Sequence, residues 1–235
     1  MNSVPAGTAV IRVSRVLVCL LVATWLAAPT PLAAQDAQEA APPAGGAVRF
    51  TTGGQVRVRS ETWSNFGFTE GNDDTFILLR LLVDADLRVG EYVRAFVRLR
   101  SAVSTDRDLP GGRRGLEADD LDLQDAFVDL ILPLASDVVL TARAGREGLL
   151  FGKQRLVSPL DWANTQRTFD GASVLVSSGD LLIRGFWAQP VVIQKTKFNR
   201  SDPARNLFGV HASDVLPNAL PVLDLYWLGI VRDST

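Results

Sequence analysis

The sequence predicts an all-β fold, an antiparallel transmembrane β-barrel that is present as an incomplete barrel fragment of about nine strands. Three observations support this prediction. Apolar and polar residues alternate with a period of two along most of the chain after residue 50, as in strands with one apolar and one polar face. The longest alternating segments have about 12 residues, whereas soluble strands have about five or six and membrane-crossing strands roughly 9–11. Short turns and long polar loops follow one another, as in outer-membrane barrels.

Residues 1–34 have the layout of a secretory signal peptide. Arg12 and Arg15 form a positively charged start, and Val16–Ala28 is an apolar run without charge. This run is shorter than the roughly 20 residues of a spanning helix, so a retained membrane anchor is the weaker alternative. We therefore expect cleavage after Ala34 and export from the cytoplasm. Cleavage would also remove Cys19, the only cysteine.

The predicted mature chain has a flexible start and no strong charge. Residues 35–50 are rich in Ala, Pro, Gly and Gln and are expected to form a flexible leader. Residues 51–235 are the predicted N-terminal part of the barrel. Without the two arginines of the signal peptide, 22 basic residues face 26 acidic ones, a net charge of −4, which gives no basic footprint for nucleic acid.

The strands are expected to follow one another from residue 53 onward. A first alternating stretch contains Arg57 and Arg59, and it is followed by Phe76–Arg88 and by Tyr92–Val103. A helix would repeat its apolar residues every three to four positions, and these segments do not. Further strands are expected at Asp120–Leu132, Val138–Arg146, Gly171–Ser177, Leu181–Gln189, Leu207–Ser213 and Val222–Val231.

The connections predict which ends of the strands face outward. Val89–Glu91 is a tight turn, expected on the periplasmic side, and Ser104–Asp119 is a long polar loop, expected outside. The alternation slips once within Asp120–Leu132, and a β-bulge at Gln124–Asp125 would restore it. Barrels must close with an even number of strands, so nine strands ending near Thr235 indicate a fragment. A complete small barrel of about eight or ten strands is the alternative.

Several segments, taken in order, resemble the alginate-export family of outer-membrane barrels. They are Gly54–Arg57, Phe76–Leu82, Leu121–Asp129, Gly145–Glu147, Arg167–Gly171 and Leu223–Gly229. Gly148 departs from the family's pattern, because an acidic residue is expected after the Gly-Arg pair, and the family's closing strands are not seen. The resemblance implies an anion-conducting barrel more directly than it implies alginate as the cargo.

The polar face of the strands predicts a lumen that is enriched in arginine. Arginine rings favour anions in pores, and the guanidinium group binds carboxylates through two parallel hydrogen bonds. The expected pore-lining residues are Arg57, Arg59, Arg80, Arg88, Arg94, Arg98, Arg100 and Arg143, with Glu61, Asp84, Asp86 and Asp122 as counter-charges. The alternative is that these pairs only neutralise a polar barrel interior.

Arg155 and Arg167 lie in a long segment, residues 148–170, for which the sequence leaves two possibilities. The segment is either a constriction loop folded into the lumen or an external loop, and we favour the external loop. The only histidine, His211, has Ser213 two residues away, but no complete nucleophile–base–orienter set is visible. We therefore predict that the protein is not an enzyme and has neither a cofactor nor a metal site.

These observations lead to one main functional hypothesis and two alternatives. We expect a channel in the bacterial outer membrane, surrounded by lipid, for an alginate-like anionic polysaccharide or for smaller anions. One alternative is a structural or adhesive outer-membrane barrel that transports nothing. The other is a soluble periplasmic β-sandwich that binds sugars. The sequence does not identify the cargo, the direction of flux or the oligomeric state.

Overall fold

The computed structural model describes residues 47–108, 112–214 and 223–233. The predicted signal peptide and residues 35–46 of the predicted leader lie outside the described residues. The strands are β1 (Val48–Trp63), β2 (Asp74–Val89), β3 (Val93–Ser104), β4 (Asp119–Pro133), β5 (Val138–Glu147), β6 (Phe169–Ser178), β7 (Leu181–Val192), β8 (Arg200–Ser201), β9 (Arg205–Ser213) and β10 (Leu225–Arg232). A short 3-10 helix, η1 (Phe66–Phe68), lies between β1 and β2. No helix among the described residues is long and apolar enough to cross a membrane.

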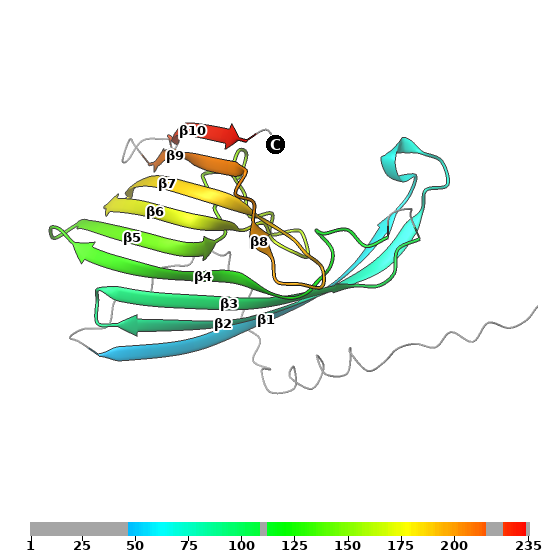
Figure 1. The fold of residues 1–235 in the computed structure, drawn as a ribbon, viewed down its shortest axis with the longest axis horizontal. Coiled ribbons are helices and arrows are strands. Elements are labelled where there is room, and N and C mark those ends of the chain that lie inside the picture. The colour runs from blue at the N-terminus through cyan, green and yellow to red at the C-terminus, as the bar shows by residue number, and fades with distance from the viewer. Residues whose placement is uncertain (1–46, 109–111, 215–222, 234–235) are drawn as a thin grey trace, which may run out of the picture. The chain divides into compact units, whose positions relative to one another are not determined.

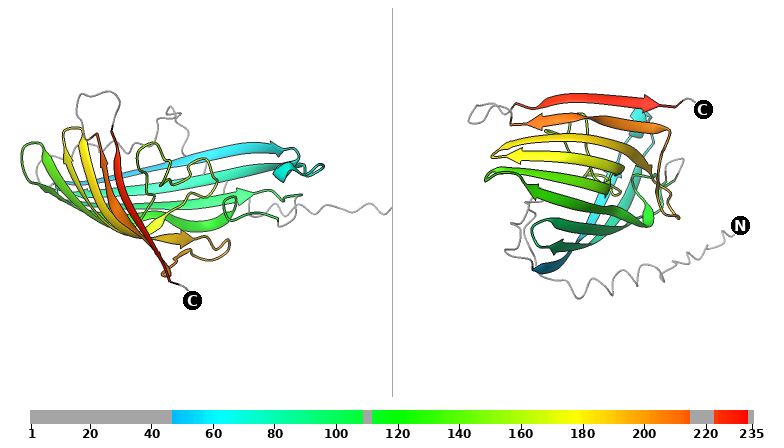
Figure 2. Two further views of the ribbon diagram at one scale, coloured as in Figure 1. Left: turned by 90° about the horizontal axis from the view of Figure 1, so that it is seen from above. Right: turned by 60° about the vertical axis from the view of Figure 1, so that its left-hand side comes forward.

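The strands form one antiparallel sheet in the order β1-β2-β3-β4-β5-β6-β7-β9-β10, and the two-residue strand β8 pairs with β7 (Figure 1). Nearly every strand therefore pairs with the one that precedes it in the sequence. The sheet curves strongly and has a concave and a convex side (Figure 2). It is open in the described residues, with β1 and β10 at its two edges. This is the architecture expected for part of an up-and-down barrel.

The nine predicted strands are all present, and β8 is an addition. The first four strands have 16, 16, 12 and 15 residues, which exceeds the roughly 9–11 residues needed to cross a membrane. The sheet begins at Val48, three residues before the predicted boundary at residue 51. Val222, the predicted start of the last strand, lies outside the described residues, and β10 begins at Leu225.

The convex side of the sheet is apolar and exposed. In β3, Val93, Val97 and Leu99 are 38%, 41% and 41% exposed, while the alternating arginines face the concave side. A soluble β-sandwich would cover such a face with a second sheet, and the described part of the chain provides none. An exposed apolar band on the outer side is instead a feature of membrane barrels.

The predicted β-bulge in β4 is confirmed. Arg98 pairs with Asp125 and the next residue, Leu99, pairs with Leu123, so Gln124 is the extra residue. This bulge keeps the apolar residues on both sides of it on the convex face. A second register shift lies nearer the start of β4, and the alternation alone did not predict it.

Apart from the connection between β9 and β10, residues 214–224, short and long connections lie at opposite ends of the sheet, as predicted. One end has the β2–β3 turn at Gly90, whose φ of 58° favours glycine, and the short β4–β5 and β6–β7 turns. The other end has the long connections 64–73, 105–118, 148–168 and 193–204. In outer-membrane barrels the long loops are extracellular, so we refer to this second end as the loop end.

Candidate functional site

The predicted arginines lie together on the concave side of the sheet. Residues directly opposite each other on paired strands point to the same face. Arg57 is opposite Arg80, Arg88 is opposite Arg94, and Arg94 is in turn opposite Asp129. The same relation extends to the arginines of β5, because Arg143 is opposite Asp129 on its other side. The alternation therefore placed these side chains on one face correctly.

A ladder of ion pairs connects the arginines of β3 and β5. Arg94 Nη2 lies 2.8 Å from an oxygen of Asp86. The buried carboxylate of Asp129 lies 2.6 Å from Arg143 Nε and 3.8 Å from Arg94 Nη1. Arg143 also lies 3.0 Å from Glu147. These pairs form one continuous network across β2 to β5, with Asp129 shared by two arginines.

The ladder continues toward β7, and a separate set of ion pairs lies beside it on β2 to β4. Arg184 of β7 pairs with Glu147, so the network reaches four strands beyond β3. In the separate set, Arg98 of β3 lies 3.5 Å from both Asp84 of β2 and Asp125 of β4. Six of the eight predicted arginines lie within 4.0 Å of a carboxylate. Most of the positive charge on this face is therefore balanced locally.

The predicted counter-charges are only part of this network. Glu61, Asp84 and Asp86 each pair with a predicted arginine. Asp122 instead lies 3.4 Å from Arg146, outside the predicted set. Sequence reasoning missed six members of the ion pairs on this face, although the bulge itself places two of them, Asp125 and Asp129, in the inward phase. The missed residues are Asp119, Asp125, Asp129, Arg146, Glu147 and Arg184.

Arg57 and Arg80 differ from the other arginines. Both bind main-chain carbonyl groups of the 148–168 loop: Arg57 donates to Asp161 O at 2.9 Å and to Ala163 O at 2.7 Å, and Arg80 donates to both at 3.2 Å. Arg80 also donates to the Gln55 side chain at 2.8 Å. In the described part of the chain, neither arginine has a carboxylate within 4.0 Å. Two directly opposed cations therefore share neutral acceptors.

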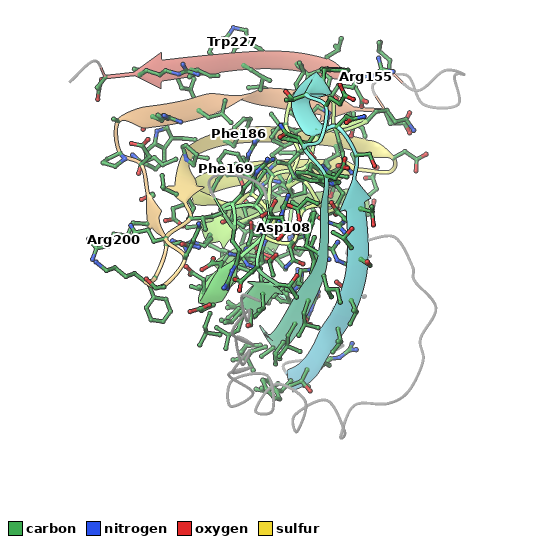
Figure 3. The ribbon with its side chains drawn as sticks, turned by 90° about the vertical axis from the view of Figure 1, so that its right-hand side faces the viewer. Asp108, Arg155, Phe169, Phe186, Arg200 and Trp227 are labelled. Carbon is green, nitrogen blue, oxygen red and sulfur yellow. The ribbon has the colours of Figure 1, made fainter. Side chains whose placement is uncertain are left out.

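The 148–168 loop lies on the concave side of the sheet (Figure 2). Leu149, Phe151 and Val157 of the loop pack with Phe169 of β6 and Phe186 of β7 in a buried apolar cluster. Phe169 and Phe186 are labelled in Figure 3. The loop thus takes the inward position of the two that the sequence left open, and the external position that we favoured is not observed.

Hydrogen bonds and close packing hold this loop near both edges of the sheet. Asn164 is buried and its side-chain amide donates to main-chain carbonyls of Leu79 at 3.1 Å and Glu117 at 2.9 Å. At the opposite edge, Gly152 has a φ of 51° and approaches the Tyr226 hydroxyl so closely that a Cβ would collide with it. The loop is therefore fixed across the concave side from β2 to β10.

Arg167 and Arg155 have different surroundings. Arg167 lines a cavity of about 520 Å³ together with Arg205 and Arg232, above apolar residues that include Phe169. Arg155 is exposed and does not line this cavity. The structure therefore brings only one of the two predicted loop arginines to a site with several positive charges.

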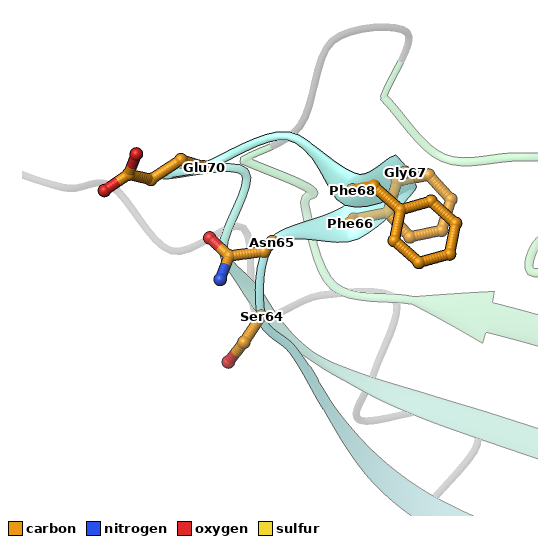
Figure 4. A pocket seen from close by; sticks show the side chains of 6 residues that line it. All are labelled: Ser64, Asn65, Phe66, Gly67, Phe68 and Glu70. Atoms are coloured by element: carbon orange, nitrogen blue, oxygen red, sulfur yellow. The ribbon is translucent and has the colours of Figure 1, made fainter.

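The β1–β2 hairpin has a hollow at its tip, and it is clamped by the next loop. The hollow is lined by residues 64–68 and Glu70, among which Phe68 is fully exposed (Figure 4). Below it, Arg107 lies 2.6 Å from Asp74 and over the ring of Phe76, 3.6 Å from its centroid. Burial disfavours this guanidinium charge, but hydrogen bonds to Asp74 and Glu117 outweigh burial and raise the pKa of Arg107. This buried pair joins the 105–118 loop to the start of β2.

His211 has a packing role. Its ring stacks on Tyr226, with 4.6 Å between centroids, and lies 5.0 Å from the ring of Phe151. A carboxylate oxygen of Asp224 lies 3.7 Å from its Nε2. The histidine therefore supports the buried cluster beneath the 148–168 loop. In the described residues, no group of three or more His, Cys, Asp or Glu side chains could hold a metal ion.

The open antiparallel sheet, with an exposed apolar convex side and a charged concave side, is of the class of transmembrane β-barrels. The family model described as "Alginate export" matches residues 48–216, which is more than half of the chain. The chain belongs to the alginate export family. This is a family of outer-membrane proteins that export polysaccharide, a transporter-type rather than an enzymatic activity. No curated protein and no solved structure matches the chain.

Proposed function

We propose that the full-length protein is a channel through which an alginate-like polyanion, or a smaller anion, crosses the outer membrane along the concave side of the sheet. The observation that carries this proposal is the Arg57–Arg80 pair. The two arginines are directly opposite residues on neighbouring strands, and their guanidinium groups bind neutral carbonyl partners. Positive charge that is not cancelled by a carboxylate attracts anions inside a pore.

The other arginines are paired with acidic side chains, which would let a polyanion pass through the lumen without binding tightly. A uronate polymer carries one carboxylate on each sugar, and a free arginine would bind each of them through a strong bidentate contact. Arg94, Arg98 and Arg143 are already bound to acidic side chains. They therefore contribute polarity with little net attraction, and the polymer is not held along the whole length of the lumen.

The 148–168 loop supports a narrowed passage. It covers part of the concave side, and its carbonyl groups bind the same two arginines that have no carboxylate within 4.0 Å in the described residues. Such a loop brings the charge close to whatever passes and limits the width of the path. The cavity lined by Arg167, Arg205 and Arg232, of which Arg205 is paired with Asp202, would provide a second positive region beside the loop.

We further propose that the protein lies in the outer membrane and is surrounded by its lipids. The convex residues, such as Val97 and Leu99, would contact the acyl chains of outer-membrane lipids. Export to that membrane would follow cleavage of the signal peptide after Ala34.

Reconstitution of the full-length protein in planar lipid bilayers tests this function. We expect single-channel steps whose reversal potential in a KCl gradient shows a preference for chloride. Alginate oligomers should reduce the current at concentrations at which an uncharged dextran of equal size has no effect. A preference for potassium would contradict the proposal. A protein that inserts and does not conduct would favour the structural or adhesive barrel instead.

A further inference from the structure

The connection between β7 and β9 carries an exposed set of cations and one exposed aromatic ring. Lys195, Lys197 and Arg200 are exposed, and Phe198 between them is 68% exposed. Lys195 donates to the main-chain carbonyl of Arg113. In the part of the chain that the structure describes, the side chains of Lys197 and Arg200 form neither an ion pair nor a hydrogen bond. We refer to residues 195–200 as the basic hairpin.

A buried asparagine fixes the conformation of the basic hairpin. Asn199 donates from its side chain to Asp119 at 2.7 Å and from its main chain to Asp122. Its own carbonyl accepts a hydrogen bond from Arg146 at 3.2 Å. Because Asn199 points inward, its two neighbours point away from the sheet. Figure 3 shows Arg200 extending away from the region in which Phe169 and Phe186 lie.

The basic hairpin lies beside the apolar convex face at the loop end. The main-chain amide of Asp120, at the start of β4, donates to the carbonyl of Lys195 at 3.1 Å. The adjacent Leu121 and the last residue of β7, Val192, are both exposed apolar residues. Cations and an aromatic ring therefore lie where the lipid-facing strands end, which is the level of the lipid headgroups in a barrel of this kind.

We propose that the basic hairpin binds the phosphate groups of a phosphorylated glycolipid in the outer leaflet of the membrane. Lysine and arginine bind phosphate through charge-assisted hydrogen bonds. An aromatic ring at the interface packs on the upper part of the acyl chains, as the rings of aromatic girdles do. The site is preorganised, because Asn199 holds both neighbours in place before the lipid arrives.

This site is independent of what passes along the concave side. It depends on the outward position of Phe198 and Arg200, and it would bind lipid whether the barrel conducts anions, conducts cations or conducts nothing. A failure of the channel experiment therefore leaves this proposal in place, and the reverse is also true.

Binding of lipid A to the detergent-solubilised full-length protein tests the proposal. The probes are diphosphorylated lipid A, the same lipid with both phosphates removed, and inorganic phosphate. We expect diphosphorylated lipid A to bind at least tenfold more tightly than the dephosphorylated lipid, with an affinity that falls as salt rises. Equal binding of both lipids would overturn the proposal. Effective competition by millimolar inorganic phosphate would also overturn it, because the site would then take free phosphate.

Variants locate the site on the protein. The double variant Lys197→Gln with Arg200→Gln should weaken binding of diphosphorylated lipid A at least tenfold. Arg49→Gln, which removes an exposed cation at the opposite end of the sheet, should change it less than twofold. Heat-dependent gel mobility reports whether each variant is folded, and both changes lie at exposed side chains. Equal affinities of the double variant and of Arg49→Gln would exclude the basic hairpin as the binding site.

Discussion

The concave side has two regions in which the same residue type is partnered differently. In β3 and β5, Arg94, Arg98 and Arg143 each lie close to a carboxylate. In β1 and β2, Arg57 and Arg80 bind main-chain carbonyls instead. A carboxylate cancels the charge that a passing ion would feel, whereas a carbonyl leaves it. We infer that the first region holds the strands together and that the second determines the electrostatic preference of the lumen.

The second region also links charge to the position of the 148–168 loop. Like charges directly opposite each other on neighbouring strands are destabilising. The carbonyl groups of Asp161 and Ala163 relieve this repulsion between Arg57 and Arg80, because each accepts from both. The loop therefore depends on the cations for its anchoring, and the cations depend on the loop for their stability.

The largest effect is expected in the paired region. Asp129→Asn removes a carboxylate that is 0% exposed and shared by Arg94 and Arg143. Breaking a buried ion pair from one side costs about 3–5 kcal/mol. The urea-unfolding midpoint of the protein in lipid vesicles, followed by tryptophan fluorescence, should fall accordingly. Glu91→Gln, at an exposed position in the β2–β3 turn, is the matched control and should leave the midpoint unchanged. An equal midpoint for both variants would show that the ladder is not structural.

The second-largest effect is expected in the 148–168 loop rather than in the sheet. Phe151→Ala removes a buried ring from the cluster with Phe169 and Phe186, a change that costs about 3 kcal/mol in a well-packed core. The loss should appear as faster protease cleavage within residues 148–168. Phe68→Ala removes an equally large ring that is fully exposed and should not change the cleavage rate. A loop that stays resistant after Phe151→Ala would have to be held by its hydrogen bonds alone.

The third effect is on ion selectivity, and it tests the difference between the two regions directly. Arg80→Gln removes charged hydrogen bonds worth about 1.5–3 kcal/mol and one cation without a carboxylate partner. In planar bilayers the chloride preference of the full-length channel should fall. The double variant Arg98→Gln with Asp84→Asn removes one charge of each sign from an ion pair and should leave the preference unchanged. A larger loss of selectivity in the double variant would reverse the roles of the two regions.

The sequence predicted the face of the sheet on which each arginine lies, but it did not predict the partners that are distant in the chain. A period of two is a property of neighbouring residues, so alternation placed Arg57, Arg80 and Arg94 on one face and located the bulge beside Asp125. The partners of those arginines depend on contacts across the sheet. Arg57 and its acceptor Asp161 are 104 residues apart, and no periodicity connects them.

The loop position was missed for the same reason. Residues 148–168 contain enough polar residues to read as an external loop, and their inward position depends on a few apolar residues. Leu149, Phe151 and Val157 pack against rings from β6 and β7, and this packing is visible only when those strands are already in place. The short spacing of the three residues is the one sequence signal that could have indicated an inward loop.

The smallest effect is expected at Arg59, which combines features of both regions. Its guanidinium lies 2.6 Å from Glu61 and also donates to the carbonyl of Trp162 in the loop. Both side chains of the pair are partly exposed, and such pairs contribute about 0–1 kcal/mol. Glu61→Gln should therefore change the free energy of unfolding, measured by urea unfolding in lipid vesicles, by no more than about 1 kcal/mol.

Glu61→Gln should also change the ion selectivity of the channel. Removing the carboxylate of Glu61 leaves Arg59 with a carbonyl partner, as at Arg57 and Arg80, so the chloride preference in planar bilayers should rise slightly. The isosteric amide can still accept the hydrogen bond from the Trp63 indole, which separates charge from packing. An unchanged preference would mean that a carbonyl-bound arginine at this position adds nothing to the field of the lumen, and the distinction between the two regions would then be limited to Arg57 and Arg80.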